Sequence, residues 1–455
     1  MKKIITFLLL IQSTLHYSQT ILATYPLELK KSKEYRQIIN AENKITHEFF
    51  AFISDKESLT ILKYNSSLFL NKQFTLARPD ISYKKLTGYS FDKDGNPTLY
   101  WSNQDLTKIM AIQYDLDNHT TSAIIEVELP FFNQSIITQF QENNIFYILA
   151  QKHFEEKLIL YRFKDGKKQE KELDFSNFKF KNTLNQEIRL SKILEVCPIE
   201  KIETSQFNPL FKGTQRTKLY ILRDKMLLTF DHNDNETQGF EIDLASAEIQ
   251  EKNYPKTATK DPVCLSNSYY HENKIYQFKA NRAELLFDIK EYKTAESIKS
   301  INVLETEIIP FKTSPLWLQI ENQKPREIKN TAKFLNQLVQ QDVGLTVYKT
   351  LNSILITIGG TGITQFLNNS NNENNAMFTD YPITTYFESV FDKKLEQTKS
   401  SQDPLAIDFI SGFVQEHPEV SLSGFIRYKN YYILSYYDTH EKKYTMRKFI
   451  DGFER

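Results

Sequence analysis

The chain has 455 residues, and its 57 Lys and Arg residues balance 57 Asp and Glu residues, so the formal net charge is zero. A neutral chain has no overall field that would draw it to nucleic acid or to an anionic bilayer, and polyanionic partners are therefore disfavoured. The length allows two or three ordinary domains, or one large repetitive architecture.

The first residues have the pattern of a secretory signal segment. Two lysines precede an apolar stretch, 4–15, which is too short to span a membrane. Cleavage after Ser18 would leave Gln19 as the first mature residue, although His16 fits the third position before the cut poorly. A retained anchor is the alternative. We expect an exported protein of the periplasm, cell surface or extracellular space, with no transmembrane segment in the mature chain.

Seven stretches of the chain share one design, in which an aromatic-rich run, a short polar turn and a second apolar run follow one another. The chain has 33 Phe and 25 Tyr but 12 Gly, and clustered aromatic residues favour the pleated surface of strands. We interpret each stretch as a β-hairpin: 48–65, 98–118, 145–166, 218–234, 274–290, 345–360 and 430–449.

These hairpins must pack on one another, because an isolated hairpin is marginally stable in water. The spacing between them leaves room for one or two further strands each, as in the four-stranded blades of a β-propeller. A pair of β-sandwiches would show shorter and more regular spacing, and a parallel β/α fold would place a helix between strands. We predict a mainly β, propeller-like single domain over 19–455, with six to eight blades and seven favoured.

The stretch "FDKDGNPTLYW" (91–101) places Asp92, Asp94 and Asn96 at alternate positions, as in the first half of a calcium loop. An EF-hand loop requires Gly at its sixth position, where counting from Asp92 finds Pro97. Asp, Gly, Asn and Pro together are the residues that tight turns require. We interpret the stretch as a hairpin turn, with an irregular calcium site as the alternative.

The same stretch resembles the Asp-x-x-Gly-Asn-x-x-Trp turn and strand of two-component-regulator-type propellers. The counterparts here are Asp92, Gly95, Asn96 and Trp101, with the Trp later than in that pattern. More broadly, the chain resembles uncharacterised exported bacterial proteins of the propeller-like type. The resemblance implies a propeller fold and no particular function.

Cys197 and Cys264 are the two cysteines of the chain. In an exported protein they could form one disulfide, but their spacing does not show that their Cβ atoms meet. Free, buried thiols are the alternative.

Two short stretches invite a ligand interpretation. "DHNDNE" (231–236) gathers carboxylates and an imidazole, which can share a metal ion, but its place between two strand runs favours a solvated loop. "IGGTG" (358–362) lacks the Lys that follows the last Gly of a phosphate-binding P-loop, and we interpret it as a glycine turn after a strand over 354–358. We expect no metal and no cofactor at either stretch.

Two segments have the pattern of amphipathic helices, 325–343 and 403–417. The first has Pro325 in its first turn, and the second has Asp403 as N-cap and Pro404 as first helical residue. Their apolar stripes comprise Ile328, Ala332, Leu335 and Val339 in the first helix, and Leu405, Ala406, Phe409, Ile410, Phe413 and Val414 in the second.

An Asn-rich stretch, "NNSNNENNAM" (368–377), lies between these two helices. It contains almost no side chain that folding could bury. We predict a mobile surface loop there.

No motif of the sequence identifies an enzyme. Neither a Gly-x-Ser-x-Gly elbow nor a His-Glu-x-x-His motif occurs, and we assign no catalytic residue. The sequence favours a non-catalytic binding or scaffolding module whose partner is a protein or glycan of the cell envelope. The alternatives are an exported hydrolase or lyase whose acidic residues converge at the propeller channel, and a structural envelope component without a small ligand.

Overall fold

The computed structural model describes residues 19–30, 32–130, 132–261, 264–369, 376–398 and 402–452. The predicted signal segment, including Ser18, lies outside these residues. The chain forms two compact units: unit 1 comprises Met1–His153, Leu158–Glu172 and Asp403–Arg455, and unit 2 comprises Phe154–Lys157 and Leu173–Gln402. The single domain over 19–455 stays a prediction.

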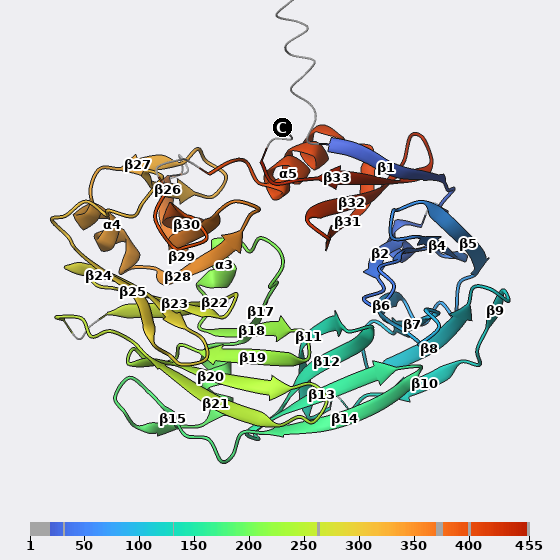
Figure 1. Ribbon diagram of the computed structural model, residues 1–455, viewed down its shortest axis with the longest axis horizontal. Coiled ribbons are helices and arrows are strands. Elements are labelled where there is room, and N and C mark those ends of the chain that lie inside the picture. The colour runs from blue at the N-terminus through green and yellow to red at the C-terminus, as the bar shows by residue number, and fades with distance from the viewer. Residues whose placement is uncertain are drawn as a thin grey trace, which may run out of the picture. The chain divides into compact units, whose positions relative to one another are not determined.

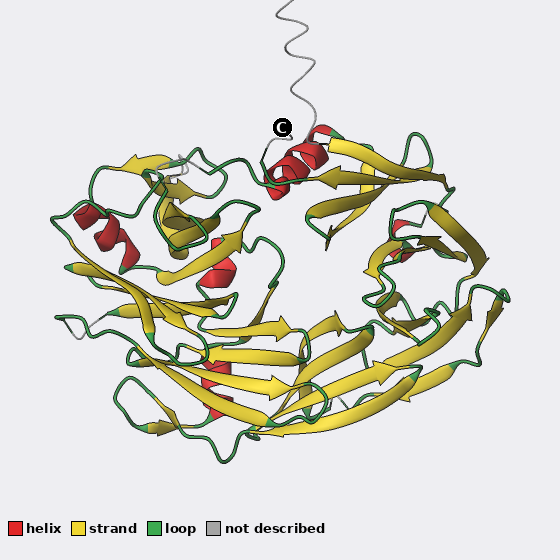
Figure 2. Ribbon diagram, in the orientation of Figure 1, coloured by secondary structure: helices red, strands yellow, loops and turns green. Residues whose placement is uncertain are grey.

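Unit 1 contains four antiparallel sheets, three of which follow one another along the chain (Figures 1 and 2). The first consists of β2 (Gln37–Glu42), β3 (Phe49–Ser54), β4 (Ser58–Tyr64) and β5 (Leu70–Ala77), and a short 3-10 helix, η1 (Lys33–Tyr35), precedes it. The second consists of β6 (Lys85–Phe91), β7 (Pro97–Ser102), β8 (Lys108–Asp115) and β10 (Ile125–Glu128), with β9 (Thr120–Thr121) paired to β8. The third consists of β11 (Gln134–Glu142), β12 (Ile145–Lys152), β13 (Lys157–Lys164) and β14 (Lys167–Asp174).

The fourth sheet of unit 1 joins the two ends of the described chain. Its strands are β31 (Val420–Tyr428), β32 (Tyr431–Asp438), β33 (Lys443–Phe449) and β1 (Gln19–Pro26). β1 pairs antiparallel with β33, from Gln19 opposite Phe449 to Pro26 opposite Lys443, and Figure 1 shows the blue β1 beside the red β33. The N-terminal strand therefore supplies the outer strand of the C-terminal sheet.

Unit 2 contains three sheets of four or five strands (Figure 1). One consists of β17 (Ile199–Ile202), β18 (Thr217–Leu222), β19 (Lys225–Phe230), β20 (Glu236–Asp243) and β21 (Ile249–Pro255), and its β17 pairs parallel with β18. The next consists of β22 (Leu265–His271), β23 (Lys274–Ala280), β24 (Glu284–Glu291) and β25 (Ser297–Leu304). The last has the order β27 (Arg326–Ile328), β26 (Leu316–Ile320), β30 (Ala376–Phe391), β29 (Ile354–Asn369) and β28 (Asp342–Lys349).

Short elements complete unit 2. A two-stranded hairpin consists of β15 (Phe180–Lys181) and β16 (Glu187–Ile188), and it is followed by α2 (Leu190–Val196). Two further helices are α3 (Leu210–Gly213) and α4 (Thr331–Leu338). Sequence analysis missed α2 and α3, which are too short to show a helical period.

The burial of the strands explains why the hairpins could be recognised. All six residues of β3 are buried, whereas the outer strand β5 has exposed residues along most of its length. A strand with both faces covered needs apolar residues at successive positions, because neighbouring side chains point to opposite faces. In unit 1, separate apolar clusters fill the spaces between successive sheets. Four-stranded sheets stacked in this way form a propeller-like fold.

The seven predicted hairpins are confirmed. Each is a pair of adjacent strands in a different sheet: β3–β4, β7–β8, β12–β13, β18–β19, β23–β24, β28–β29 and β32–β33. The described residues form seven sheets of four or five strands, in agreement with the favoured blade number.

Both amphipathic helices are present, but they begin later than predicted. Pro325 lies outside any helix and directly precedes β27, and α4 begins after Asn330, whose side chain accepts a hydrogen bond from the Lys333 amide (3.0 Å). The helix α5 (Ala406–Glu416) has Leu405 rather than Asp403 at its N-cap. In both helices the N-cap residue directly precedes the first buried residue of the helix, which is Thr331 in α4 and Ala406 in α5. α5 packs on β32 and β33 through an apolar cluster that includes Ile410 and Phe413.

Two predictions within the last sheet of unit 2 need correction. The glycine stretch 358–362 is not a turn, because β29 continues through it and pairs with β30. The predicted loop 368–377 is shorter, since the pairing extends to Asn369 opposite Ala376, and its residues 370–375 lie outside the described residues. Glycine here allows close backbone approach, as a Cβ on Gly359 would collide with the Thr385 carbonyl.

The turn at 91–101 is confirmed. It connects β6 to β7, and the Asp92 carboxylate accepts hydrogen bonds from the amides of Asp94 (2.9 Å) and Asn96 (2.8 Å). Gly95 has a φ of +82°, which the turn requires. The second Asp92 oxygen accepts a hydrogen bond from Gln113 (2.6 Å).

Candidate functional site

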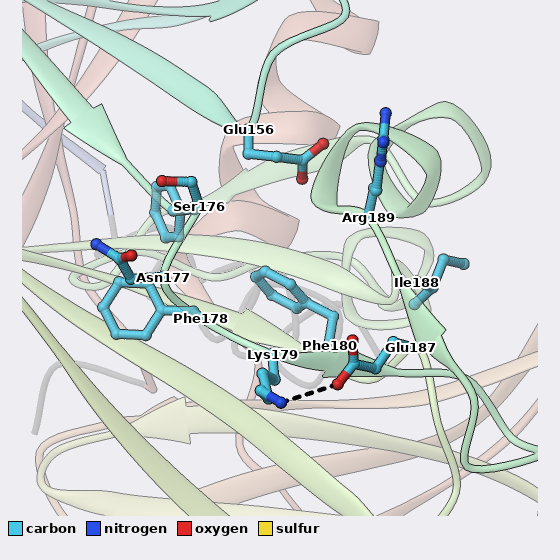
Figure 3. A pocket seen from close by; sticks show the side chains of 10 residues that line it. Glu156, Ser176, Asn177, Phe178, Lys179, Phe180, Glu187, Ile188 and Arg189 are labelled. Carbon is cyan, nitrogen blue, oxygen red and sulfur yellow. Dashed lines mark hydrogen bonds and ion pairs between the residues drawn. The ribbon is translucent and has the colours of Figure 1, made fainter.

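A cavity of about 570 Å³ lies in unit 2, around the hairpin of β15 and β16 (Figure 3). It is lined by the β12–β13 turn and by the segment that leads from β14 to α2. The lining residues are Glu156, Phe175, Ser176, Asn177, Phe178, Lys179, Phe180, Glu187, Ile188 and Arg189.

Aromatic packing holds the cavity wall in place. The rings of Phe175, Phe178 and Phe180 lie with their centroids 5.0–5.5 Å from the ring of Phe240 on β20. Phe180 also contacts Phe230 on β19, with centroids 5.6 Å apart. The segment has little regular structure of its own, so these rings anchor it to the sheet.

Two side-chain amides of the neighbouring sheet fix the backbone of the same segment. The Gln238 amide donates to the Lys179 carbonyl (3.1 Å), and the Asn233 amide donates to the Lys181 carbonyl (3.3 Å). The wall is therefore positioned by both apolar and polar contacts.

The rim of the cavity carries four charged side chains. Lys179 and Glu187 form an ion pair of 3.0 Å across the hairpin. The Glu156 carboxylate accepts a hydrogen bond from the Ser191 hydroxyl (2.9 Å). The exposed Arg189 side chain forms no hydrogen bond or ion pair with any residue in the described part of the chain.

This arrangement is suited to binding. Figure 3 shows the Phe180 ring between the Lys179–Glu187 pair and the opposite side of the cavity, where Glu156 and Arg189 lie. Phe178 and Ile188 are half-buried and offer apolar surface, while Glu156 can accept and Arg189 can donate hydrogen bonds. Small-molecule sites combine apolar walls with a few placed polar groups in this way, and the volume lies in their range.

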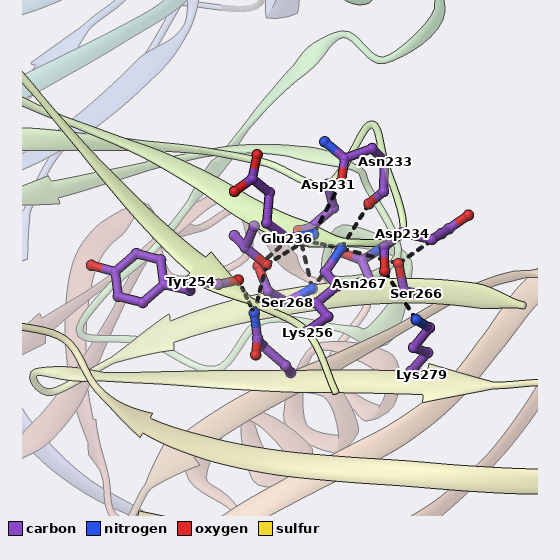
Figure 4. A network of polar contacts seen from close by, with 12 residues as sticks. Asp231, Asn233, Asp234, Glu236, Tyr254, Lys256, Ser266, Asn267, Ser268 and Lys279 are labelled. Carbon is purple, nitrogen blue, oxygen red and sulfur yellow. Dashed lines mark hydrogen bonds and ion pairs between the residues drawn. The ribbon is translucent and has the colours of Figure 1, made fainter. Parts of the chain in front are cut away.

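A second polar assembly, the Asp231 network, lies inside unit 2 (Figure 4). One Asp231 oxygen contacts Lys256 Nζ at 2.9 Å and accepts a hydrogen bond from the Thr237 hydroxyl at 2.7 Å. The other accepts hydrogen bonds from the Ser268 amide (3.0 Å) and hydroxyl (2.7 Å), and lies 3.9 Å from Lys218 Nζ. The Asp231 and Lys218 side chains are completely buried.

Burial and charge shift the pKa values within the Asp231 network. Burial opposes ionisation of Asp231, but the charges of Lys256 and Lys218 outweigh it and lower the pKa of that carboxyl to about 2. Burial lowers the pKa of Lys218 to about 8, with Asp231 acting in the opposite direction. Burial also lowers the pKa of His232 to about 4.

The interpretation of 231–236 as a solvated loop is wrong for Asp231 and Asn233, which are buried. Asp231 is fully buried because strands that arrive later in the chain supply its hydrogen-bond donors. His232 packs its ring against Phe180, with centroids 5.9 Å apart. Among the described residues, no group of three or more His, Cys, Asp or Glu side chains could hold a metal ion.

The remaining site predictions concern the two cysteines and the predicted first mature residue. Cys197 and Cys264 are free thiols, each partly buried, so the suggested disulfide is not formed. Burial raises the pKa of both thiols. Gln19, the predicted first mature residue, is the first residue of β1.

Sequence analysis missed the cavity. The stretch "FSNFKF" (175–180) has aromatic residues separated by one or two polar residues, which was a detectable signal for a half-buried extended segment. Nothing in the sequence indicated that Glu156, from a turn twenty residues earlier, faces the same space.

No helix in the described part of the chain is long and apolar enough to cross a membrane.

Comparison with known proteins identifies no family. No protein-family description matches the chain, and no curated protein matches it significantly. Among solved structures, the chain is similar to the Dos1 propeller, with 11% identity, a TM-score of 0.32, and coverage of 97% of this chain and 99% of that one. It is also similar to the β-propeller domain of Nup133 from Vanderwaltozyma polyspora (12% identity, TM-score 0.32, coverage 94% and 97%). A third is the β-propeller domain of the Trilobed protease from Pyrococcus furiosus (11% identity, TM-score 0.31, coverage 93% and 95%). At this level of similarity, the likenesses carry no information on function.

Proposed function

We propose that the protein is an exported, non-catalytic binding module and that the cavity between Glu156 and the β15–β16 hairpin is its ligand site. Export is supported by the signal pattern of the first residues. The signal is predicted to end after Ser18, and the first strand begins at Gln19.

The ligand that fits this cavity best is a saccharide of the cell envelope. Phe178 and Ile188 present apolar surface to the C–H face of a sugar ring, and the Glu156 carboxylate can accept hydrogen bonds from ring hydroxyls. Arg189 adds donors in a fixed planar arrangement. The single observation that carries the proposal is this combination, in one cavity, of an anchored aromatic wall with a guanidinium that has no partner among the described residues.

Calorimetric titration of the purified protein with envelope oligosaccharides tests the proposal. The substitutions Phe178→Ala and Arg189→Gln should each weaken binding about 10-fold, since each removes a contact worth about 1.4 kcal/mol. Phe211→Ala is the matched control, because Phe211 is 55% exposed and lies outside the cavity. It should leave the affinity unchanged.

Three results would contradict the proposal. If no oligosaccharide binds, or if Phe211→Ala weakens binding as much as Phe178→Ala, the cavity is not a saccharide site. If the bound oligosaccharide is cleaved, the hydrolase or lyase alternative replaces the binding module.

A further inference from the structure

The contacts of Lys218 within the Asp231 network place an amine against an amide carbonyl inside unit 2. Lys218 Nζ donates to Asn267 Oδ1 at 2.5 Å, and both residues are completely buried. Lys218 lies on β18 and Asn267 on β22, so the contact connects two neighbouring sheets. Asp231 Oδ2 lies 3.9 Å from the same Nζ.

The Asn267 side chain is held in one orientation. Its Nδ2 donates to the Thr214 carbonyl (2.9 Å) and to the Val343 carbonyl (2.8 Å). Its Oδ1 accepts a second hydrogen bond, from the Ser268 amide at 2.8 Å. The Ser268 amide keeps its hydrogen bond to Oδ1 when Lys218 attacks, and a donor on this oxygen stabilises the negative charge that develops there.

We propose that Lys218 and Asn267 form an intramolecular isopeptide bond, with Asp231 as the proton-transfer group. Asp231 takes a proton from the Lys218 ammonium, and the neutral Nζ adds to Asn267 Cγ. A new Nζ–Cγ bond forms and the Cγ–Nδ2 bond breaks. One of the two protons that Nζ still carries passes to Nδ2, which leaves as ammonia and takes up the proton held by Asp231. An amine and a primary amide thus give a secondary amide and ammonia, with no oxidant or co-reactant.

The surroundings favour this reaction. A buried amine and amide held in contact need no further loss of translational entropy to react. The lowered pKa of Lys218, about 8 through burial, leaves a fraction of the amine neutral and nucleophilic at neutral pH. Asp231 remains ionised, as a proton acceptor must be.

Peptide mass spectrometry of the purified, denatured chain tests the proposal directly. Trypsin should not cut after a modified Lys218, so peptides 217–223 and 261–274 should appear as one branched species. Its mass should equal the sum of the two peptides minus one ammonia. Complete recovery of the two segments as separate peptides, even after the native protein has been held at about pH 9, would overturn the proposal.

Variants separate the roles of the three residues. Asp231→Asn should slow formation of the branched species about 100-fold, the usual contribution of a general acid–base group. Lys256→Gln is the matched control, because Lys256 also contacts Asp231 but its other hydrogen bonds go to the Asn233 backbone carbonyl and the Ser266 hydroxyl rather than to a side-chain amide. It should still cross-link, and loss of the branched species in folded Lys256→Gln together with its persistence in Asp231→Asn would contradict the assigned roles.

The pH dependence of formation gives a second test. Besides Asp231, the charged or titratable groups that act on Lys218 are Lys256, Arg216 and Cys197. Because the neutral amine attacks, formation should be faster at about pH 9 than at about pH 6. A rate that falls over this range would contradict attack by Lys218.

Discussion

His232 lies at the boundary between the cavity wall and the Asp231 network. Its ring packs against Phe180 and Phe230, in surroundings that stabilise the neutral imidazole. Burial therefore lowers its pKa from the ordinary value of 6.5 to about 4. An unfolded chain binds a proton at His232 over this interval and the folded chain does not, so folding stability falls as the pH decreases from about 6.5 to about 4.

Replacement of His232 by Phe should remove this acid sensitivity, because the ring contacts are kept while the titrating group is lost. Between about pH 7 and about pH 4.5, the wild-type protein should lose about 2 kcal/mol more of its free energy of unfolding than His232→Phe. Urea titrations at the two pH values give both numbers. Equal losses in the two proteins would show that His232 is not the responsible group.

Asp231 contributes to the loss of folding stability at still lower pH. Its folded pKa of about 2 lies below the ordinary 3.8, so the stability it provides is complete above about pH 4 and is lost as the pH falls towards 2. The acid losses of His232 and Asp231 therefore occupy successive intervals of pH.

Asp231 also shows which kind of contact cannot be inferred from the sequence. Asp231 receives donors from Ser268 and a charge from Lys256, which lie on strands or loops that come later in the chain. Before the sheets are placed, an Asp after a strand cannot be distinguished from any solvated turn residue. Asp92, whose partners are its own near neighbours, was interpreted correctly from the sequence.

At the scale of elements, the glycines of β29 show how closely β29 and β30 approach each other in the last sheet of unit 2. A Cβ on Gly359 would lie 2.8 Å from Tyr386 Cα and would also collide with the Thr385 carbonyl. These obstacles are backbone atoms of β30, which cannot move without breaking the strand pairing. By contrast, a Cβ on Gly362 of the same strand would meet the Gln341 side chain at 3.3 Å, and that side chain can yield.

Gly359→Ala should therefore destabilise the protein by about 3 kcal/mol, the upper range for an overpacked site. Gly362→Ala should change the free energy of unfolding by less than about 1 kcal/mol, and serves as the control. Thermal or urea unfolding of both variants measures the difference. Similar effects of the two substitutions would show that close approach of β29 and β30 is not what requires Gly359.

The central strands were predictable from the sequence and the outer strands were not. A strand such as β3 is buried on both faces and reads "FFAFIS", whereas β14 reads "KKQEKELD" and has no apolar pattern. The helices were recognised by their apolar stripes, but strand β27 preceding α4 is only three residues long and gave no signal. The cavity wall was missed because β15 and β16 have two residues each, although the aromatic residues of 175–180 gave a detectable signal.

At the scale of the whole molecule, the described chain begins and ends in one sheet. β1 covers the edge of β33 over its full length, and it thereby satisfies backbone groups that would otherwise be exposed. Tyr25 and Leu22 of this strand pack against the apolar cluster beneath the sheet.

Removal of residues 19–26 should therefore lower the melting temperature and cause association of the purified protein, because the bare β33 edge can pair with another chain. Calorimetry and size-exclusion chromatography measure the two effects. A truncated protein that melts with the wild type and stays monomeric would show that β1 is dispensable.

The pairing of β1 with β33 also sets an order of events for an exported chain. While the translocation machinery holds a leader that ends after Ser18, the leader would restrain β1. The β32–β33 hairpin, which is synthesised last, needs β1 as its neighbour. The C-terminal sheet would then consist of β31, β32 and β33 alone until the leader is cut or released. In that order of events, cleavage after the predicted Ser18 site would precede the pairing of β1 with β33.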